Sequence, residues 1–464
     1  MTEFRKLVVR LEESGELVRI AREVDRKYEL GAVQSKLERS GKAVIFDKVK
    51  GSGMPVIGGL MTDIRRIGMA LGRADPDHFD NFQHAAEFGQ ANAAPVKPET
   101  VDTGPAKEVI QTGDDVDLTA LPVPTYFEFD SGPFITSAVG ISLDQDSGEY
   151  NVGVYRTLIL GRRRMVVNAS SMSDLRRIYN NAESTGGSMP IVLAIGADPA
   201  LLMAAVSKAM PGVSEIDIAG ALQGQPVRLA KAETSDLPVP VDAEIVIEGT
   251  IDFSEKVENT LGEYAGQYGP ETAPVAIATA ITHRKDALFH AITAGANPEH
   301  NTLGTISIYS MRAMLTNALR ERFPNIKQLD LVVKPRLTGT MMQIFISIAK
   351  KNDEEPKQLI REAFDFDGGF LPLSRIVKRI VVVDEDVDIF DYGDVEWAIW
   401  SRVADPDKII ILDHYTSWEL DRSAKEGGKS VRVGIDATMD LEDVDELIRP
   451  RAPGFENIDL NEYI

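Results

Sequence analysis

A series of short apolar runs in the middle of the chain constrains the fold more than any other feature. The runs are rich in β-branched residues, and clusters of Gly, Asp and Ser separate them. They cover Phe134–Leu143, Val152–Leu160, Arg164–Ala169, Ile191–Ile195, Glu244–Ile251 and Val275–Thr282. Many short strands separated by turns, with few long helices, are typical of a barrel or a closed sheet.

The regions on either side of these runs combine helices with strands. Near the N-terminus, Phe4, Leu7 and Leu11 follow helical spacing, and two strand-like runs come after them. After residue 305, helical stripes alternate with β-branched runs, which is typical of an α/β unit. Because 464 residues exceed one ordinary core, we predict three domains in an α/β (α+β) protein. The predicted domains are an N-terminal α/β domain at 1–105, which ends in a Pro-rich linker, a β-rich central domain at 106–304 and a C-terminal α/β domain at 305–464.

The net charge of -22 and the absence of cysteine exclude several kinds of partner and site. A surface this negative repels nucleic acid and anionic lipid. Without cysteine, the chain has no disulfide, thiolate metal site, Fe–S cluster or cysteine nucleophile. The N-terminal residues lack the features of a signal peptide, and no apolar run approaches the ~18 residues of a spanning helix. We therefore expect a cytoplasmic protein that binds neither nucleic acid nor membrane.

Two familiar kinds of motif are rejected on spacing. The segment Gly427–Ser430 resembles the end of a phosphate-binding P-loop, but Ser423 stands where that motif needs glycine. The six histidines show no ligand spacing on one helix, so each is interpreted as an ordinary surface or core residue. Neither feature therefore locates a site.

Three segments concentrate chemically useful residues, although each has an ordinary interpretation. Asn151–Arg156 begins a predicted strand, and its arginine could simply be an edge residue. Glu215, just before a small-residue turn, could ligate a metal or begin a helix. Glu258 and Glu263 are expected on a loop between strands. Paired carboxylates can raise one pKa and keep a proton near neutrality, but two solvated loop glutamates would look the same.

Together these segments resemble the UbiD family of decarboxylases, which use prenylated flavin mononucleotide (prenylated FMN). The resemblance extends along almost the whole chain, and that many ordered matches is more specific than any single motif. The main matching segments are Asp130–Pro133, Asn151–Arg156, Ala197–Pro199, Ser214–Glu215 with Ala219–Gly220, Ala243–Gly249, Gly262–Glu263 and Gly434–Thr438. The resemblance implies a central split β-barrel that binds the flavin and a C-terminal domain for oligomerisation.

The resemblance also implies a role for individual residues. Arg156 holds the substrate carboxylate, Glu258 orients Arg156, and Glu263 donates the proton. Asn151 and Glu215 match two ligands of a Mn²⁺ or Mg²⁺ ion that holds the flavin phosphate. The matched cofactor-binding residues are Val154, Tyr155, Arg156, Asn168, Ala169, Ser170, Ser173 and Lys378, the last of them on the phosphate. Potassium is expected near Arg402.

One position departs from the family. Members usually place a histidine, as a third metal ligand, where this chain reads Ser171-Met172-Ser173. A thioether is a soft ligand that suits manganese or magnesium poorly. Either Ser171, water or phosphate then completes the coordination of the metal, or the cation binds weakly.

The resemblance implies reversible, non-oxidative decarboxylation of an aromatic, heteroaromatic or α,β-unsaturated acid, with the flavin as electron sink. Burial and the neighbouring Glu258 are expected to raise the pKa of Glu263 so that it can act as a general acid. The segment Asn297–Ile308 is expected to line the pocket, where His300 could contact a polar substituent. The expected partners are the acid and CO2, a flavin prenyltransferase that supplies the cofactor, and further copies of this chain in a homodimer or homohexamer. Two alternatives are a cofactor-deficient, non-catalytic or assembly homologue and a flavin oxidoreductase with a similar barrel.

Overall fold

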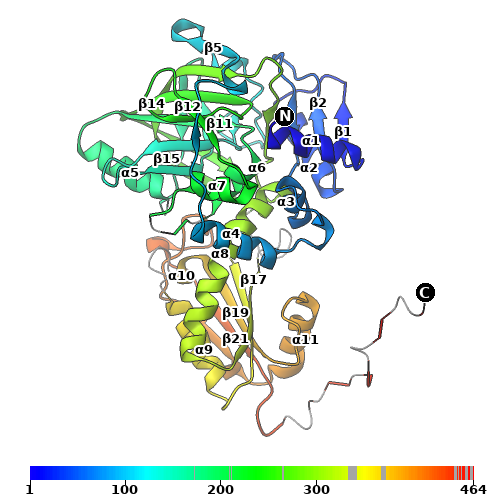
Figure 1. Cartoon of the computed structure of the whole chain (residues 1–464). Coiled ribbons are helices and arrows are strands. Elements are labelled where there is room, and N and C mark those ends of the chain that lie inside the picture. Colours follow the sequence, from blue (N-terminus) through cyan, green and yellow to red (C-terminus); the bar gives the residue numbers. More distant parts are fainter. Residues whose placement is uncertain are drawn as a thin grey trace. The chain divides into compact units, whose positions relative to one another are not determined.

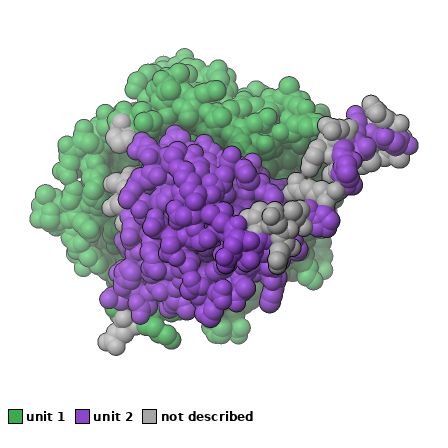
Figure 2. Space-filling view, turned by 90° about the horizontal axis from the view of Figure 1, so that it is seen from below, with its two compact units in different colours: residues 1–314, 333–342, 417–428 green, residues 315–332, 343–416, 429–464 purple. Residues whose placement is uncertain are grey.

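The computed structural model describes residues 1–171, 173–207, 209–210, 212–263, 266–332, 342–366, 373–443, 447, 449–450, 452–454, 458–459 and 463. Two compact units make up this chain (Figure 2). Unit 1 contains residues 1–314 and 417–428, and unit 2 contains residues 315–332, 343–416 and 429 onward. The predicted N-terminal and central domains therefore lie within one unit, and the boundaries given above stay predictions.

The N-terminal part of unit 1 is a four-stranded sheet with helices, as its mixed pattern predicts. Its elements are α1 (Glu3–Glu13), β1 (Leu17–Ile20), α2 (Glu29–Arg39), β2 (Ala43–Phe46), β3 (Val56–Gly58), α3 (Ile64–Ala70) and α4 (Asn81–Ala93). In α1 the periodic Phe4, Leu7 and Leu11 are buried, and the Thr2 side chain caps the first turn. A later strand, β16 (Phe289–His290), completes the sheet beside β3. This late strand is one reason why the first two predicted domains form a single unit.

The central part of unit 1 is a nine-stranded sheet. Its strands are β5 (Val109–Thr112), β6 (Phe134–Ile135), β7 (Val139–Leu143), β8 (Tyr150–Val154), β9 (Thr157–Ile159), β10 (Arg164–Val167), β11 (Met189–Ile195), β14 (Ile245–Gly262) and β15 (Tyr268–His283). The order is β6-β9-β10-β15-β14-β11-β7-β8, with β5 beside β15. Only Tyr155 and Arg156 connect β8, at one end of this path, to β9 near the other end. The sheet must therefore curve back on itself as a split barrel, with Arg156 at the seam.

Three helices and a small sheet accompany the barrel. The helices are α5 (Asp174–Ser184), α6 (Pro199–Val206) and α7 (Glu215–Gln223), and the small sheet contains β4 (Glu99–Thr100), β12 (Arg228–Lys231) and β13 (Pro238–Pro240). Short 3-10 helices lie at Pro76–His78, Pro105–Lys107, Gly113–Asp115, Leu118–Ala120 and Pro406–Lys408.

All six apolar runs of the sequence contain strands, so the predicted β-rich centre is confirmed. Two runs are interrupted, since β6 and β7 divide the first and β8 and β9 divide the second. The expectation that Glu258 lies on a loop is wrong, because β14 continues to Gly262 and pairs with β15 along a long hairpin (Figure 1). The turn between these strands begins at Glu263, where the Glu263 amide donates to the Gln267 carbonyl.

Unit 2 is the α/β unit that the alternating C-terminal pattern predicts. Helix α8 (Pro298–Arg322) continues into it from unit 1. The later elements are β17 (Ile326–Val332), β18 (Met342–Ile348), α9 (Glu355–Asp365), α10 (Leu373–Ile376), β19 (Val377–Asp384), α11 (Tyr392–Arg402), β20 (Ile409–Leu412) and β21 (Arg432–Ala437). The strand order is β17-β18-β19-β21-β20, and α9 packs against β19 and β21 (Figure 1). No helix in the described part of the chain is long and apolar enough to cross a membrane.

Candidate active site

The seam of the barrel is built by a pair of glycines under one tyrosine ring. Gly140 of β7 and Gly153 of β8 are cross-strand partners, and a Cβ on either would collide with the Tyr155 ring. The ring therefore lies back over β7 and β8, where only glycine leaves room for it. The Tyr155 amide donates to the Ala138 carbonyl at 3.3 Å. This packing fixes the backbone immediately before Arg156.

Arg156 lies between two carboxylates at the seam. Its Nη1 forms an ion pair with Glu263, and its Nη2 bonds Glu271 Oε2 at 2.8 Å. The side chains of Glu263 and Glu271 are only 5% and 12% exposed, so water screens these charges weakly. The Arg156 Nε is buried and has no hydrogen-bond partner among the described residues. Nη1 and Nη2 each make one of these two ion pairs, so their remaining N–H groups are the donors that the guanidinium could offer to a ligand.

The second acid differs from the one expected from the sequence. Opposite residues of an antiparallel pair share a face, and the register places Asn259 opposite Glu271 and Glu258 opposite Thr272. Glu258 therefore points to the other face of the hairpin and is exposed. In the described part of the chain no bond links Glu258 to Arg156, so the expected pairing of Glu258 with Arg156 differs from the structure.

A second arginine holds the far side of Glu271. Arg176 of α5 bonds Glu271 Oε1 at 2.7 Å, and the Ala169 amide donates to the same oxygen at 3.0 Å. Arg176 also donates from its Nε to the Ala169 carbonyl at 2.9 Å. Glu271 therefore links the hairpin to the segment that follows β10.

An amide pair joins the same two elements. Asn168 and Asn259 exchange side-chain hydrogen bonds of 2.9 Å, and the Asn168 amide donates to the Arg156 carbonyl at 3.0 Å. Further along, Ser173 caps α5 and donates to the Ser170 carbonyl at 2.8 Å. Of the predicted flavin-contacting residues, Asn168 therefore lies directly beside Arg156, and Ser170 and Ser173 are bonded to each other.

Glu263 combines burial with a cluster of charges. Burial raises its pKa, the Arg156 guanidinium lowers it, and the charges of Glu271, Asp130 and Glu419 raise it further. Gly269, the cross-strand partner of Leu261, leaves room for the Glu263 side chain, because a Cβ there would lie 2.8 Å from Glu263 Cγ. The net direction is upward, which favours a protonated carboxyl.

An acidic loop holds the end of β14 in place. Asp130 accepts hydrogen bonds from the amides of Gly262 at 2.9 Å and Phe127 at 2.8 Å. The Phe127 ring lies against Gly262 and Gly295, and a Cβ on either glycine would collide with it. The Asp130–Pro133 segment, which the sequence singled out without a role, therefore positions the residue before Glu263.

His300, in the first turns of α8, is half-buried. Burial and the charge of Arg156 lower its pKa to about 4, although a hydrogen bond with the Gly295 backbone opposes them. At neutral pH this ring can therefore accept or donate a hydrogen bond without adding a second cation near Arg156.

The two candidate metal ligands share a neighbour. Asn151 donates to the Tyr155 hydroxyl at 2.9 Å. Burial raises the pKa of Tyr155, and the charge of Glu215, at the start of α7, raises it further. Oxygen donors such as these suit magnesium or manganese. No group of three His, Asp or Glu side chains that could hold a metal occurs among the described residues.

The possible third metal ligands are only partly described. Met172 lies outside the described residues. Ser171 binds the Glu419 carboxylate through its hydroxyl at 2.6 Å and its amide at 2.9 Å. A metal that used Ser171 would have to compete with Glu419.

Two predicted sites fall in unit 2. Lys378 of β19 donates to Ser430 Oγ at 2.8 Å, and the buried Arg432 donates to the same hydroxyl at 2.6 Å. Arg432 also donates to the carbonyls of Ser374 and Ser430, so its contacts fasten this part of unit 2, and phosphate binding by Lys378 stays a prediction. Arg402 bonds Asp384 at 2.8 Å and Asp386 at 2.7 Å, so both carboxylates already have a cation. The potassium expected near Arg402 stays a prediction.

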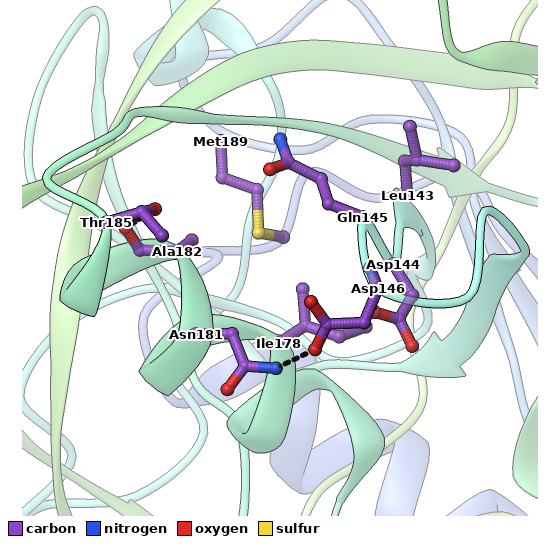
Figure 3. Close-up of a pocket in the computed structure, with 9 residues that line it drawn as sticks. All are labelled: Leu143, Asp144, Gln145, Asp146, Ile178, Asn181, Ala182, Thr185 and Met189. Atoms are coloured by element: carbon purple, nitrogen blue, oxygen red, sulfur yellow. Dashed lines mark hydrogen bonds between the residues drawn. The ribbon is translucent and has the colours of Figure 1, made fainter.

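A pocket in unit 1 is lined by other residues. It opens beside α5, between the β7–β8 turn and the start of β11 (Figure 3). Its lining consists of Leu143, Asp144, Gln145, Asp146, Ile178, Asn181, Ala182, Thr185 and Met189. None of the predicted site residues belongs to it.

Glu271 is the residue that sequence reasoning missed. The signal was present in the hairpin, because residues five apart on a regular strand face opposite sides. Glu258 and Glu263 could therefore share a face only across an irregularity. If the two strands are paired around a turn that begins at Glu263, Glu271 falls on the same face of the hairpin as Glu263, and Glu258 falls on the opposite face.

Comparisons with known proteins agree along the whole chain. Three family descriptions for 3-octaprenyl-4-hydroxybenzoate carboxy-lyase match, with the N-terminal domain at residues 8–86, the Rift-related domain at 99–297 and the C-terminal domain at 305–437. A structure of the UbiD-class enzyme HmfF from Pelotomaculum thermopropionicum in complex with FMN is 34% identical, with a TM-score of 0.85, over 99% of this chain and 100% of that one.

Two further structures support the same assignment. An evolved dimeric form of HmfF in complex with prFMN is 33% identical over 100% of both chains, with a TM-score of 0.81. The Sedimentibacter hydroxybenzoicus vanillic acid decarboxylase in its open form is 25% identical over 98% of this chain and 97% of that one, with a TM-score of 0.80. With its three regions matched and a full-length relative above 30% identity, this chain belongs to the UbiD family of carboxy-lyases.

Proposed function

We propose that this protein catalyses the reversible, non-oxidative decarboxylation of an aromatic, heteroaromatic or α,β-unsaturated carboxylic acid with prenylated FMN. The observation that carries the proposal is the contact of Arg156 with the buried Glu263. One group can hold a carboxylate, and the other can store a proton beside it. Decarboxylation needs both functions, because CO2 leaves a carbon that must then be protonated.

The two residues divide the work. Arg156 holds the substrate carboxylate through charge-assisted hydrogen bonds. When bound, the prenylated flavin supplies the sink for the electrons left by CO2, which no side chain can provide. Glu263 then delivers its proton to the carbon as a general acid. Because the pKa of Glu263 is raised, its carboxyl keeps the proton up to a pH closer to neutrality.

The cofactor-binding residues follow from the family resemblance. We propose that Val154, Tyr155, Asn168, Ala169, Ser170 and Ser173 contact the flavin and that Lys378 binds its phosphate. Asn151 and Glu215 would bind a Mn²⁺ or Mg²⁺ ion at that phosphate, with potassium near Arg402. A flavin prenyltransferase would supply the cofactor to a cytoplasmic homodimer or homohexamer.

The test is to co-express the chain with a flavin prenyltransferase and analyse the ligand that it releases. We expect the mass and absorbance of prenylated FMN, and CO2 release from at least one acid in a panel of aromatic, heteroaromatic and unsaturated acids. Bound prenylated FMN without CO2 release or deuterium exchange for any acid would contradict the proposal.

A second candidate is a cofactor-deficient, non-catalytic or assembly homologue. The observation that favours it is Met172, which stands where family members usually have a metal-binding histidine. This candidate predicts protein that purifies without flavin even with the prenyltransferase and excess Mn²⁺. Stoichiometric flavin would exclude it.

A further inference from the structure

The geometry points to Glu271 as a positioning residue of the reaction, which holds Arg156 in place through a bridge to Arg176 and Ala169. The inference rests on the proposed function and deepens it. It assigns the stationary carboxylate beside Arg156 to Glu271, on β15, whereas the sequence suggested Glu258 on β14.

Both oxygens of Glu271 are engaged by different elements. Oε2 accepts from Arg156 at the barrel seam, while Oε1 accepts from Arg176 of α5 and from the Ala169 amide. Arg176 also donates a hydrogen bond from its Nε to the Ala169 carbonyl. Arg176 and the Ala169 amide thus fix the position of the Glu271 carboxylate, and the carboxylate in turn fixes the position of Arg156.

The two acids on Arg156 are therefore not equivalent. Two guanidinium groups compensate the charge of Glu271, and a backbone amide supports it. Among the described residues Glu263 pairs with one arginine, and burial raises its pKa. When a substrate carboxylate binds Arg156, Glu263 can yield its place by taking up a proton. Glu271 stays bonded to Arg156 and keeps its guanidinium oriented toward the substrate carboxylate.

The ordinary alternative is that Glu271 only fastens the hairpin to α5. Glu248 provides a matched control, because it is also a buried carboxylate on the same hairpin. It accepts from the Glu233 amide at 2.7 Å and the Thr234 amide at 2.8 Å, and its described bonds involve no arginine. Loss of its charge should therefore affect stability alone.

The experiment compares Glu271→Gln, Glu271→Asp and Glu248→Gln with wild type as flavin-loaded protein. We measure kcat and KM with the best acid of the panel, the pH profile, the thermal midpoint and the binding of benzoate by calorimetry. We expect Glu271→Gln to lower kcat/KM about 100-fold and to weaken benzoate binding at least tenfold.

The pH profile separates positioning from fastening. Removing the Glu271 charge removes one cause that raises the pKa of Glu263. The alkaline limb of kcat/KM should therefore move to lower pH in Glu271→Gln and stay in place in Glu271→Asp, which keeps the charge and part of the rate. Glu248→Gln should lower the thermal midpoint and leave kcat, KM and the limb unchanged.

Two results would overturn the inference. One is a Glu271→Gln enzyme with kcat, KM and benzoate affinity within twofold of wild type. The other is a Glu271→Gln enzyme that loses thermal stability with an unshifted alkaline limb, as a fastening residue would. An inactive wild type with bound prenylated FMN would instead count against the proposed function, so the two failures are distinguishable.

Discussion

Unit 1 contains two buried pairs of acids that solve the same electrostatic problem in different ways. Glu263 and Glu271 share Arg156, and Glu271 has Arg176 as well. Glu38 and Glu299 are 3% and 0% exposed, and among the described residues no lysine or arginine is bonded to either.

The second pair depends on neutral donors. Glu299 accepts the amides of Gly59, Leu60 and Met61 at 2.8 to 3.1 Å, and His290 lies 3.3 Å from it. Burial and the charge of Glu299 raise the pKa of Glu38 to about 7. This pair therefore holds a proton near neutrality and fixes the start of α8 to the segment after β3. In the first pair, Glu263 can give up Arg156 to a substrate because Glu271 keeps two arginines. In the second pair, the backbone amides bound by Glu299 hold the start of α8 in place.

The largest expected effect is on turnover in the arginine pair. Glu263→Gln keeps the shape of the side chain but cannot donate a carboxylic proton, so kcat should fall about 10³-fold with flavin content unchanged. CO2 release and flavin absorbance measure the two quantities. Glu38→Gln, in the other pair, should keep kcat within a few fold. A Glu263→Gln enzyme within tenfold of wild type would remove the functional distinction between the pairs.

The next effect is on stability in the amide pair. Glu299→Ala leaves three buried amides of the segment after β3 without their acceptor. Each unsatisfied buried donor costs about 1–3 kcal/mol, so the loss of three should lower the free energy of unfolding by at least about 3 kcal/mol. Denaturant titration followed by circular dichroism measures it, with Glu258→Ala as the exposed control for stability. A loss below about 1 kcal/mol would show that the amides find other acceptors.

A third test uses the pH dependence of stability. The folded pKa of Glu38, about 7, exceeds its ordinary value of 4.5, so the folded state binds more protons between these pH values. The free energy of unfolding therefore falls as pH rises from 4.5 to 7, by at most about 3 kcal/mol. Glu38→Gln should remove that part of the slope. Parallel slopes in urea titrations of the two proteins would mean that the pair does not hold a proton.

The sequence predicts the elements of unit 1 better than the pairings between them. The spacing in α1 and the β-branched runs identify their elements, because periodicity is a local property. Arg156 and Glu263 are in contact, and their catalytic roles stay predictions. Glu271 and the Glu38–Glu299 pair depend on contacts between residues up to 261 apart, which no local pattern contains. The side of the hairpin on which Glu258 lies could not be predicted either, because the apolar run ends at residue 251 and β14 continues to Gly262.

The smallest expected effect concerns a cluster in unit 2, formed by Lys378, Arg432 and Ser430. Its charged groups are cations, whereas those of the two pairs above are acids. Lys378 and Arg432 both donate to Ser430 Oγ. If this cluster binds the flavin phosphate, Lys378→Ala should lower flavin retention about tenfold, since one charge-assisted hydrogen bond contributes roughly 1.5 kcal/mol or more. The flavin-to-protein ratio after extended dialysis measures it. Lys357→Ala is the matched control, because Lys357 pairs with Asp407 on the same unit. An equal ratio in both variants would mean that the lysine next to Ser430 serves the fold of unit 2 alone.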